Sequence, residues 1–270
     1  MKTSIALTIA GSDSSGGAGI QADLKTFSAL GVYGASAITA LTAQNTMGVA
    51  AIHTVPPAFI RAQIDAVFED LAVGAVKIGM LGTEGAIAAV AEALRRQCAA
   101  PVVLDPVMIA GSGAPLLDDG AEFAIRSHLM PLADIVTPNL PEAARLLGAA
   151  QAVDEKMMVR QGELLLTLGP KAVLIKGGHS GGPEAVDIFL DGTNVVRLAA
   201  DRIPTRNTHG TGCTLASAIT AFLAGGLSML DSVRHAKVYL TNALIHADEL
   251  AVGRGGGPVH HFHALWGNVT

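Results

Sequence analysis

The sequence contains little cysteine, no excess of basic residues and no long apolar run. Its two cysteines, Cys98 and Cys213, lie far apart among 270 residues, which excludes a disulfide framework and a metal site based on cysteine spacing. The 18 basic residues stand against 23 acidic ones, so no surface for nucleic acid or anionic membranes is indicated. No run reaches the about 18 apolar residues of a membrane span, and the short apolar start is no convincing signal peptide. We therefore expect a cytoplasmic, reduced protein.

Half of the residues are hydrophobic, enough for one large domain over residues 1–270 with a substantial core. Apolar runs of strand length alternate with longer amphipathic patterns, which predicts an α/β fold. Several strands are apolar on both faces, as in a mostly parallel sheet flanked by helices. The expected strands cover residues 5–10, 34–43, 49–55, 75–79, 102–107, 134–137 and 172–176, with a β-hairpin over 185–199. The expected helices cover residues 18–30, 57–71, 83–97, 120–129, 141–147, 154–168, 213–224 and 230–250.

Polar residues and glycines follow these strands, where α/β folds bind their ligands. In chain order they are the segment 11–19, Gln44, Met80, Asp105, Val107, Asn139, Glu142 and Lys176. Asp105 and Glu142 could hold a hydrated Mg²⁺, which needs only one or two carboxylates beside phosphate oxygens. A solvated aspartate and a helix-capping glutamate are the alternative. Lys176 ends an apolar strand beside two glycines, so it either meets an anion such as phosphate or extends its ammonium to solvent.

The run Asn-Thr-His-Gly-Thr-Gly-Cys-Thr at residues 207–214 precedes an apolar stretch that is typical of a packed helix. Gly210 and Gly212 allow successive N–H groups to converge, and the helix adds the positive end of its dipole, so the segment predicts a cradle for an anion. Cys213 in the first turn would feel the same field, which would lower its thiol pKa and suit it to acid–base or nucleophilic chemistry. The alternative is a glycine-rich connection with an inert, packed cysteine.

Two other nucleotide motifs are not supported. The pattern Gly17-x-Gly19-x-x-Ala22 follows a strand as a dinucleotide fingerprint does, but residues 44–45 are amides where the ribose-binding acid is required. The chain also lacks the Gly-x-x-x-x-Gly-Lys-Ser/Thr sequence of the usual P-loop. The segment 210–213 is therefore the best candidate for binding a nucleotide phosphate.

A histidine tract near the C-terminus resembles a metal-binding sequence; it consists of His260, His261 and His263. No acidic or thiol partner accompanies them in the sequence, so a docked or solvated tail is the favoured interpretation. His209 and Cys213 lie four residues apart, but two ligands do not make a zinc site.

Seven segments, in order over nearly the whole chain, closely resemble the bacterial hydroxymethylpyrimidine/phosphomethylpyrimidine kinases of thiamine biosynthesis. They are residues 10–26, 39–46, 77–81, 137–143, 176–179, 207–214 and 257–263. The resemblance is specific because related ribokinase-like enzymes usually carry Asp at the position of Cys213. The chain departs from some relatives in its first loop, where Ser12 and Ser14 replace Thr and Pro. It implies a ribokinase-like three-layer α/β sandwich, a homodimer, and a kinase that uses ATP and Mg²⁺. Its reactions would be two successive phosphorylations of 4-amino-5-hydroxymethyl-2-methylpyrimidine.

The resemblance also assigns residues to the pyrimidine substrate. The ring would lie near Gly11, Asp23, Gln44, Met80 and Val107. The Gln44 amide presents a donor beside an acceptor and so matches an aminopyrimidine edge, while Met80 and Val107 could sandwich the ring.

The resemblance assigns a second set of residues to the nucleotide. Mg²⁺ and the phosphates would be served by Asp105, Asn139 and Glu142, with Lys176 and Lys237 toward the nucleotide phosphates. Residues 108–117, with Gly111 and Gly113, resemble a flap that closes over the site and excludes water.

In the implied reaction the moving phosphoryl group would be held by the amides of Gly210, Thr211, Gly212 and Cys213. Cys213 would accept the hydroxymethyl proton. Two alternatives stay open. One is a pyridoxal kinase of the same superfamily, since some relatives with a similar cysteine-containing loop phosphorylate that ring alcohol. The other is a nucleotide-binding regulator that has lost catalysis, which the loss of Asp105, Glu142 or Cys213 would indicate; all three are present.

Overall fold

The computed structural model describes residues 3–109, 116–118, 120–178 and 181–267. Its centre is an eight-stranded sheet with the strand order β10-β9-β8-β7-β6-β5-β1-β2. Neighbouring strands are parallel, except that β9 runs against both β8 and β10. The strands are β1 Ile5–Ala10, β2 Tyr33–Ile38, β5 Ala75–Ile78, β6 Val102–Leu104, β7 Ile135–Val136, β8 Ala172–Lys176, β9 Glu184–Leu190 and β10 Val195–Asp201. The mostly parallel sheet that the sequence predicts is confirmed.

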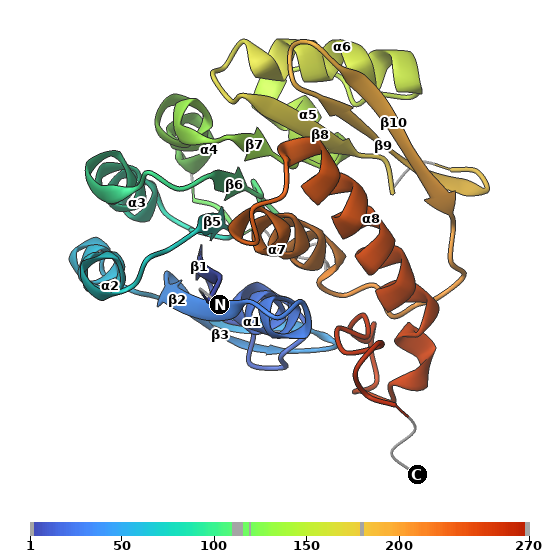
Figure 1. Cartoon of the computed structure of the whole chain (residues 1–270), viewed down its shortest axis with the longest axis horizontal. Helices are drawn as coiled ribbons and strands as arrows, with labels where there is room; N and C mark the ends of the chain where they lie inside the picture. Colours follow the sequence, from blue (N-terminus) through green and yellow to red (C-terminus); the bar gives the residue numbers. More distant parts are fainter. Residues whose placement is uncertain (1–2, 110–115, 119, 179–180, 268–270) are drawn as a thin grey trace.

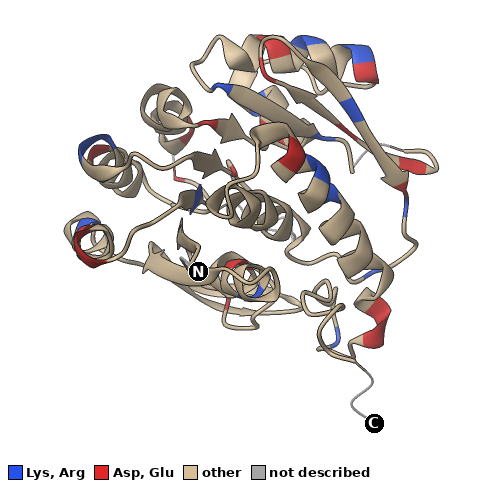
Figure 2. Cartoon of the chain, viewed as in Figure 1, with Lys and Arg blue, Asp and Glu red and all other residues tan. Residues whose placement is uncertain are grey.

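Helices cover both faces of this sheet and complete a three-layer sandwich (Figure 1). One face carries α2 (Pro57–Asp70), α3 (Glu84–Gln97), α4 (Ala121–Ala124), α5 (Leu140–Leu147) and α6 (Glu155–Leu166). The opposite face carries α1 (Gly19–Ala29), α7 (Thr211–Ala224) and α8 (Met229–Ile245). Within the part of the chain that the structure describes, none of the helices has the length and apolarity of a membrane span. Both signs of charge are distributed over the outer helices α2, α3 and α6 (Figure 2).

The central strands are buried on both sides because their side chains alternate between two cores. In β6, Val102 and Leu104 pack into the core beneath α2 to α6, whereas Val103 packs into the core beneath α7 and α8. In β8, Val173 packs into the core beneath α2 to α6 and Leu174 packs into the core beneath α7 and α8. This period of two explains why these strands are continuous apolar runs in the sequence.

The expected strand over residues 34–43 is divided in the structure. The chain leaves the main sheet at Thr39, whose N–H donates to Ala10 O at 3.0 Å and whose Oγ1 donates to Met80 O at 2.7 Å. It continues as β3 (Ala40–Asn45), which pairs with β4 (Gly48–Thr54) in a separate two-stranded sheet. The apolar pattern runs through this point without a turn residue, so the sequence did not reveal the division.

The expected helix over residues 120–129 is also irregular. After α4 the chain forms a π-helical turn, Ile125–Leu129, and a 3-10 turn, Met130–Leu132. The β-hairpin expected over 185–199 is confirmed as β9 and β10. The last expected helix ends at Ile245 instead of continuing to residue 250.

Candidate active site

The end of β8 and the segments that follow β1 and β6 meet the first turn of α7, and the segment after β5 is joined to the one after β1. Gly11 N–H donates to Met80 O at 3.0 Å, which joins the ends of β1 and β5. A side chain on Gly212 would lie 3.3 Å from Lys176 Nζ and 3.6 Å from Asp105 Oδ2. The structure therefore brings the strand-end residues and the glycine-rich segment together, as expected from the carboxyl ends of a parallel sheet.

Residues 207–213, here called the anion loop, turn sharply into α7. Gly210 has φ +80°, and a side chain on it would collide with the carbonyl oxygen of Gly17, so only glycine fits. Thr214 N–H donates to Gly210 O at 2.8 Å inside the helix. The N–H groups of Gly212 and Cys213 precede that bond and point ahead of the helix. This arrangement can bind an anion.

The thiol of Cys213 differs from the expectation drawn from the sequence. Burial raises its pKa to about 11, and Asp23 and Asp105 add to the rise. The Lys77 ammonium and a hydrogen bond from Gly19 N–H act in the opposite direction. The expected lowering of the thiol pKa is therefore wrong, because desolvation outweighs the field of the helix end. The thiol keeps its proton at neutral pH.

A buried group of charges lies beside the anion loop. Lys176 Nζ donates to Asp105 Oδ1 at 2.8 Å and lies 4.0 Å from Glu142 Oε2. Thr137 Oγ1 donates to the same Asp105 oxygen at 3.1 Å. Asp105 is only 1 % exposed, so the alternative of a solvated aspartate is wrong. Lys176 meets a carboxylate and does not extend into solvent.

Glu142 caps α5, as the alternative interpretation proposed. Its N–H donates to Asn139 Oδ1 at 2.9 Å, and its Oε2 accepts Asn139 N–H at 2.8 Å, which forms a capping box. Burial raises the pKa of Glu142 to about 7; Lys176 opposes this rise and Asp105 adds to it. An approaching cation would favour the ionised form of this carboxyl.

Two carboxylates at this place suit a hydrated divalent ion. Among the described residues there is no cluster of three or more side chains able to enclose a metal ion. Mg²⁺ does not require such a cluster, because it keeps several waters and takes one or two carboxylates with phosphate oxygens. Asp105 and Glu142 fit this requirement, since both already face the single ammonium of Lys176.

The predicted pyrimidine residues do not form one group: Gly11, Met80 and Gln44 lie around the loop after β1, whereas Val107 lies beside Asp105. A side chain on Gly11 would come within 3.0 Å of the Met80 sulphur, so these two residues are in direct contact. Ser14 Oγ donates to Gln44 O at 2.7 Å, which fastens β3 to the loop after β1. Val107 N–H donates to Asp105 O at 2.8 Å and so lies next to the charged group.

Asp13 and His209 join the two halves of the site, and sequence reasoning missed this pair. His209 Nε2 lies 2.8 Å from Asp13 Oδ2 and 3.4 Å from the Gln44 amide nitrogen. Burial opposes the charge of Asp13, but hydrogen bonds from His209, Ser15 and Ala18 hold the pKa of this carboxyl well below its usual range. The pattern Asp-Ser-Ser-Gly-Gly, typical of a turn stabilised by an aspartate, was the available signal.

Asp23, which the resemblance places near the pyrimidine, lies beneath the site. Its side chain is fully buried, and its two oxygens accept hydrogen bonds from Lys77 at 3.0 and 2.9 Å, from Thr8 at 2.6 Å and from Ser217 at 2.6 Å. In this structure the carboxylate is fully engaged inside the protein. The sequence signal for this buried ion pair was Lys77, a lysine within a strand that is otherwise apolar.

Lys237, expected toward the nucleotide phosphates, is tied to β9. Its Nζ lies 2.7 Å from Asp187 Oδ2 and donates to Ala185 O at 3.0 Å. Asp187 Oδ1 accepts Gly177 N–H at 3.0 Å. Lys237 therefore supports the backbone that directly follows Lys176.

The histidine tract belongs to a docked segment, residues 253–263, here called the C-terminal segment. His209 N–H donates to Gly257 O at 3.0 Å, and Gly257 N–H donates to Asn207 Oδ1 at 2.9 Å. His261 is only 4 % exposed, and its Nε2 lies 3.1 Å from Thr214 Oγ1. The interpretation as a docked tail is confirmed, and the segment holds the anion loop in place.

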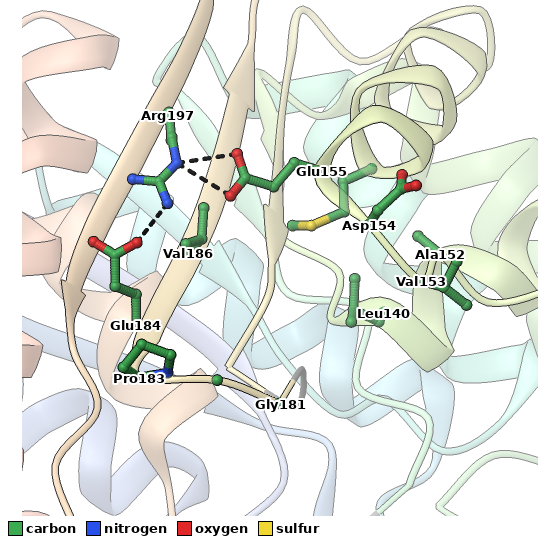
Figure 3. Close-up of a pocket in the computed structure, with 12 residues that line it drawn as sticks. Leu140, Ala152, Val153, Asp154, Glu155, Gly181, Pro183, Glu184, Val186 and Arg197 are labelled. Carbon is green, nitrogen blue, oxygen red and sulfur yellow. Dashed lines mark hydrogen bonds and ion pairs between the residues drawn. The ribbon is translucent and has the colours of Figure 1, made fainter.

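Open hollows on the described part of the chain lie away from most of these residues. A cavity of about 300 Å³ lies between α5, α6 and the β9–β10 hairpin, and none of the predicted site residues lines it (Figure 3). Arg197 in its wall pairs with Glu155 at 3.0 Å and Glu184 at 2.7 Å. A wider hollow of about 680 Å³ reaches Thr208 at the start of the anion loop. Most of the expected flap, at 110–115, lies outside the described residues.

Comparison with known proteins agrees with this geometry. The model of the phosphomethylpyrimidine kinase family matches residues 13–260. The hydroxymethylpyrimidine/phosphomethylpyrimidine kinase of Rhizobium meliloti (strain 1021) is 58 % identical over 264 residues, which cover 98 % of this chain and 99 % of that protein. The crystal structure of phosphomethylpyrimidine kinase from Clostridium difficile 630 is 48 % identical with a TM-score of 0.79, covering 90 % of this chain and 100 % of that one.

The fold is shared more widely than the sequence. An ADP complex of Bacillus subtilis pyridoxal kinase has a TM-score of 0.89 but is only 36 % identical, covering 97 % of this chain and 99 % of that one. The fold is thus that of the ribokinase-like vitamin kinases. The sequence is closer to the pyrimidine kinases than to this pyridoxal kinase.

Proposed function

The chain belongs to the phosphomethylpyrimidine kinase family, and on that premise we propose which of its residues carry the two phosphorylations. It is a phosphotransferase of an ATP-using family, and it phosphorylates the hydroxymethylpyrimidine and then its monophosphate in thiamine biosynthesis. One observation supports the placement of the reaction: the anion loop touches the Lys176–Asp105 pair. Helix amides, a buried ammonium and carboxylates face the same space there.

The anion loop would hold the phosphoryl group during its transfer. Phosphoryl transfer depends mostly on positioning and on stabilising negative charge, because its transition state is usually loose. The donors would be the amides of Gly210, Gly212 and Cys213, with Lys176 and Asn139 toward the nucleotide phosphates. The N–H of Thr211 donates to Thr208 O at 3.2 Å and so would hold the turn of the loop. Lys237 would act through Asp187 by fixing the backbone after β8.

Asp105 and Glu142 would hold Mg²⁺. When bound, the ion would neutralise part of the negative charge on the phosphate oxygens. Both carboxylates are already directed at a cation, Lys176; burial raises the pKa of Glu142 and the neighbouring Asp105 adds to the rise, so a further cation at this place would favour the ionised form. Titration of ATP affinity with Mg²⁺ in the Asp105→Asn variant tests this assignment; an unchanged dependence on Mg²⁺ contradicts it.

The neutral thiol of Cys213 suits the second reaction. Its acceptor is a phosphate that is already largely ionised at neutral pH, so a strong base is unnecessary and a fixed negative neighbour would repel it. Kinetics of Cys213→Asp on both substrates decide this point. The proposal requires greater damage to the second step than to the first, and equal or lesser damage contradicts it.

In the first reaction Cys213 would accept the proton of the hydroxymethyl group. With a thiol pKa of about 11 the thiolate is scarce at pH 7, but it is a correspondingly strong base. We therefore expect kcat for the free alcohol to rise by up to about tenfold per pH unit between pH 7 and 9, and kcat for the monophosphate to change little. A Cys213→Ala variant with near-normal turnover of the alcohol would exclude this role, and Cys213→Ser serves as the size-matched control.

Two other functions are tested alongside. Side-by-side turnover of the pyrimidine alcohol and of pyridoxal measures any pyridoxal kinase activity, which the shared fold with the Bacillus subtilis enzyme makes worth testing. An assay of ATP consumption that follows both the mono- and diphosphate products excludes a regulator without catalysis if turnover is observed.

The remaining expectations concern assembly and location. We propose a homodimer of single-domain subunits spanning residues 1–270. The hairpin of β3 and β4 supports a dimer because it presents the exposed side chains Leu41, Met47 and Ile52 outside the main sheet. Light scattering coupled to gel filtration tests the mass. We expect the protein in the cytoplasm, where Cys213 stays reduced, and cell fractionation tests the location.

A further inference from the structure

The core beneath the site contains a lysine that the catalytic scheme above does not use. Lys77 is the third residue of β5, between Val76 and Ile78, and its side chain has no exposed surface. Lysine is almost never fully buried without a partner, because desolvation of its ammonium is costly. Across the sheet it stands next to Thr8 of β1, on the face that α7 covers.

Lys77 forms a closed ion pair with Asp23. Its Nζ lies 3.0 and 2.9 Å from the two carboxylate oxygens, and Thr8 and Ser217 donate one further hydrogen bond to each oxygen at 2.6 Å. Burial opposes the charge of Lys77, but Asp23 holds its pKa above the usual value. A side chain on residue 79 would lie 2.6 Å from Nζ of Lys77. The glycine at this position therefore leaves space for the ammonium group.

This pair lies one helical turn beneath Cys213 on two helices. On α7, Ser217 follows Cys213 by four residues and therefore lies on the same face. On α1, Asp23 follows Gly19 by four residues, and the N–H of Gly19 acts on the thiol of Cys213 by lowering its pKa. The hydrogen bonds of Asp23 thus connect the two helix ends that meet at the thiol.

The charges around Cys213 alternate in sign. Lys77 and Asp23 lie on the side of the core, and Asp105 and Lys176 lie on the side of the strand ends. Lys77 has the largest effect of these charges on the thiol, and it favours the thiolate. A buried ion pair is weak evidence for a role in stability, since well-packed apolar residues in its place are often as stable. The distinctive property of the Lys77–Asp23 pair is instead its position behind the sulphur of Cys213.

We propose that Lys77 is a positioning residue for the first phosphorylation: through Asp23 and Ser217 it fixes the face of α7 that carries Cys213, and it keeps a positive charge behind the sulphur. The inference rests on the proposed proton transfer to Cys213. The proton of the hydroxymethyl group passes to the Cys213 thiolate while the alcohol oxygen bonds to the transferred phosphoryl group and ADP leaves. The negative charge that the sulphur carries before this step is the charge that Lys77 stabilises.

The experiment compares the two reactions in one enzyme. In the Lys77→Met variant we expect the ratio of kcat for the alcohol to kcat for the monophosphate to fall by about tenfold, equivalent to one pKa unit of the base. The double variant Asp23→Asn/Lys77→Met, which leaves no unpaired buried charge, covers the case in which the single variant fails to fold. It should show a smaller fall of the ratio, because the effect of Lys77 on the thiol exceeds that of Asp23. The matched control is Lys171→Met, which removes a lysine whose side chain is 80 % exposed and leaves the ratio unchanged.

A purely structural role of Lys77 would lower both reactions equally, so an unchanged ratio overturns the proposal. Alkylation of the thiol separates this failure from failure of the proposed function. In a Cys98→Ser background, Lys77→Met should slow the reaction of Cys213 with iodoacetamide at pH 9 by about tenfold. An unchanged alkylation rate overturns the action of Lys77 on the thiol. A normal alcohol turnover in Cys213→Ala overturns the proton transfer itself, whatever the alkylation rate.

Discussion

His261 should make the stability of this protein fall in mild acid. Burial, with Lys25 nearby, lowers the pKa of His261 from 6.5 to about 3, so the folded chain keeps this imidazole neutral where the unfolded chain protonates it. The stabilising contribution is fully present above pH 6.5 and is lost as the pH falls toward 3. Between pH 7.5 and pH 5 the loss amounts to about 2 kcal/mol, because the unfolded imidazole becomes protonated over this range while the folded one, with a pKa of about 3, stays neutral.

The variant His261→Gln isolates this contribution. Glutamine does not titrate, and its amide can replace the contact of Nε2 with Thr214 Oγ1, which is 3.1 Å long. Urea denaturation at pH 7.5 should show the variant less stable than the natural chain, by about 1 kcal/mol or more for the lost packing. At pH 5 the difference should shift by about 2 kcal/mol in favour of the variant.

The control is His53→Gln, which removes a histidine from the exposed strand β4 and leaves the buried contact of His261 with Thr214 intact. If the difference between the natural chain and His261→Gln were the same at both pH values within about 0.5 kcal/mol, the imidazole would not be held neutral by burial. The placement of the C-terminal segment against α7 would then need revision.

Three further substitutions test the site. Gly210→Ala forces a side chain into a left-handed backbone against a carbonyl oxygen, so steady-state kinetics should show kcat reduced at least about 100-fold with native circular dichroism; a near-normal kcat would refute the anion loop. Asn139→Ala removes the cap of α5 and should cost about 1 kcal/mol in urea denaturation while weakening ATP binding; unchanged stability would contradict the capping box with Glu142. Gln44→Leu should raise KM for the pyrimidine and leave KM for ATP unchanged, and equal changes in both would refute pyrimidine recognition by Gln44.

Much of the fold could be predicted because its determinants are local. The two-sided apolar strands and the intervening helices follow from periodicity, and the hairpin of β9 and β10 follows from the turn at residues 191–194. The departure of the chain from the main sheet at Thr39 depends on hydrogen bonds to Ala10 and Met80, partners that are distant in sequence. Such contacts leave no periodic signal.

The site was predictable in its composition but not in its electrostatics. The residues after the strands could be identified because a parallel sheet gathers its strand ends, and Asp105 and Lys176 meet for that reason. The thiol pKa of Cys213 was predicted in the wrong direction, because the helix dipole can be read from the sequence and burial cannot. The Lys77–Asp23 pair joins residues 54 positions apart, a pairing that arises only because α1 packs on β1, the strand next to β5.

The parallel bridge between His209 and Pro258 has a consequence for the order in which this protein matures. The sheet is complete once residue 201 has been synthesised, and α7 and α8 follow. The anion loop acquires its outer backbone partner, the Gly257 carbonyl, only after α8 has emerged and the chain has turned back. The support that Gly257 gives the anion loop is therefore added only after all of the described strands, and a chain that ends shortly after Leu250 would hold His209 by its contact with Asp13 but not by the backbone bond to Gly257.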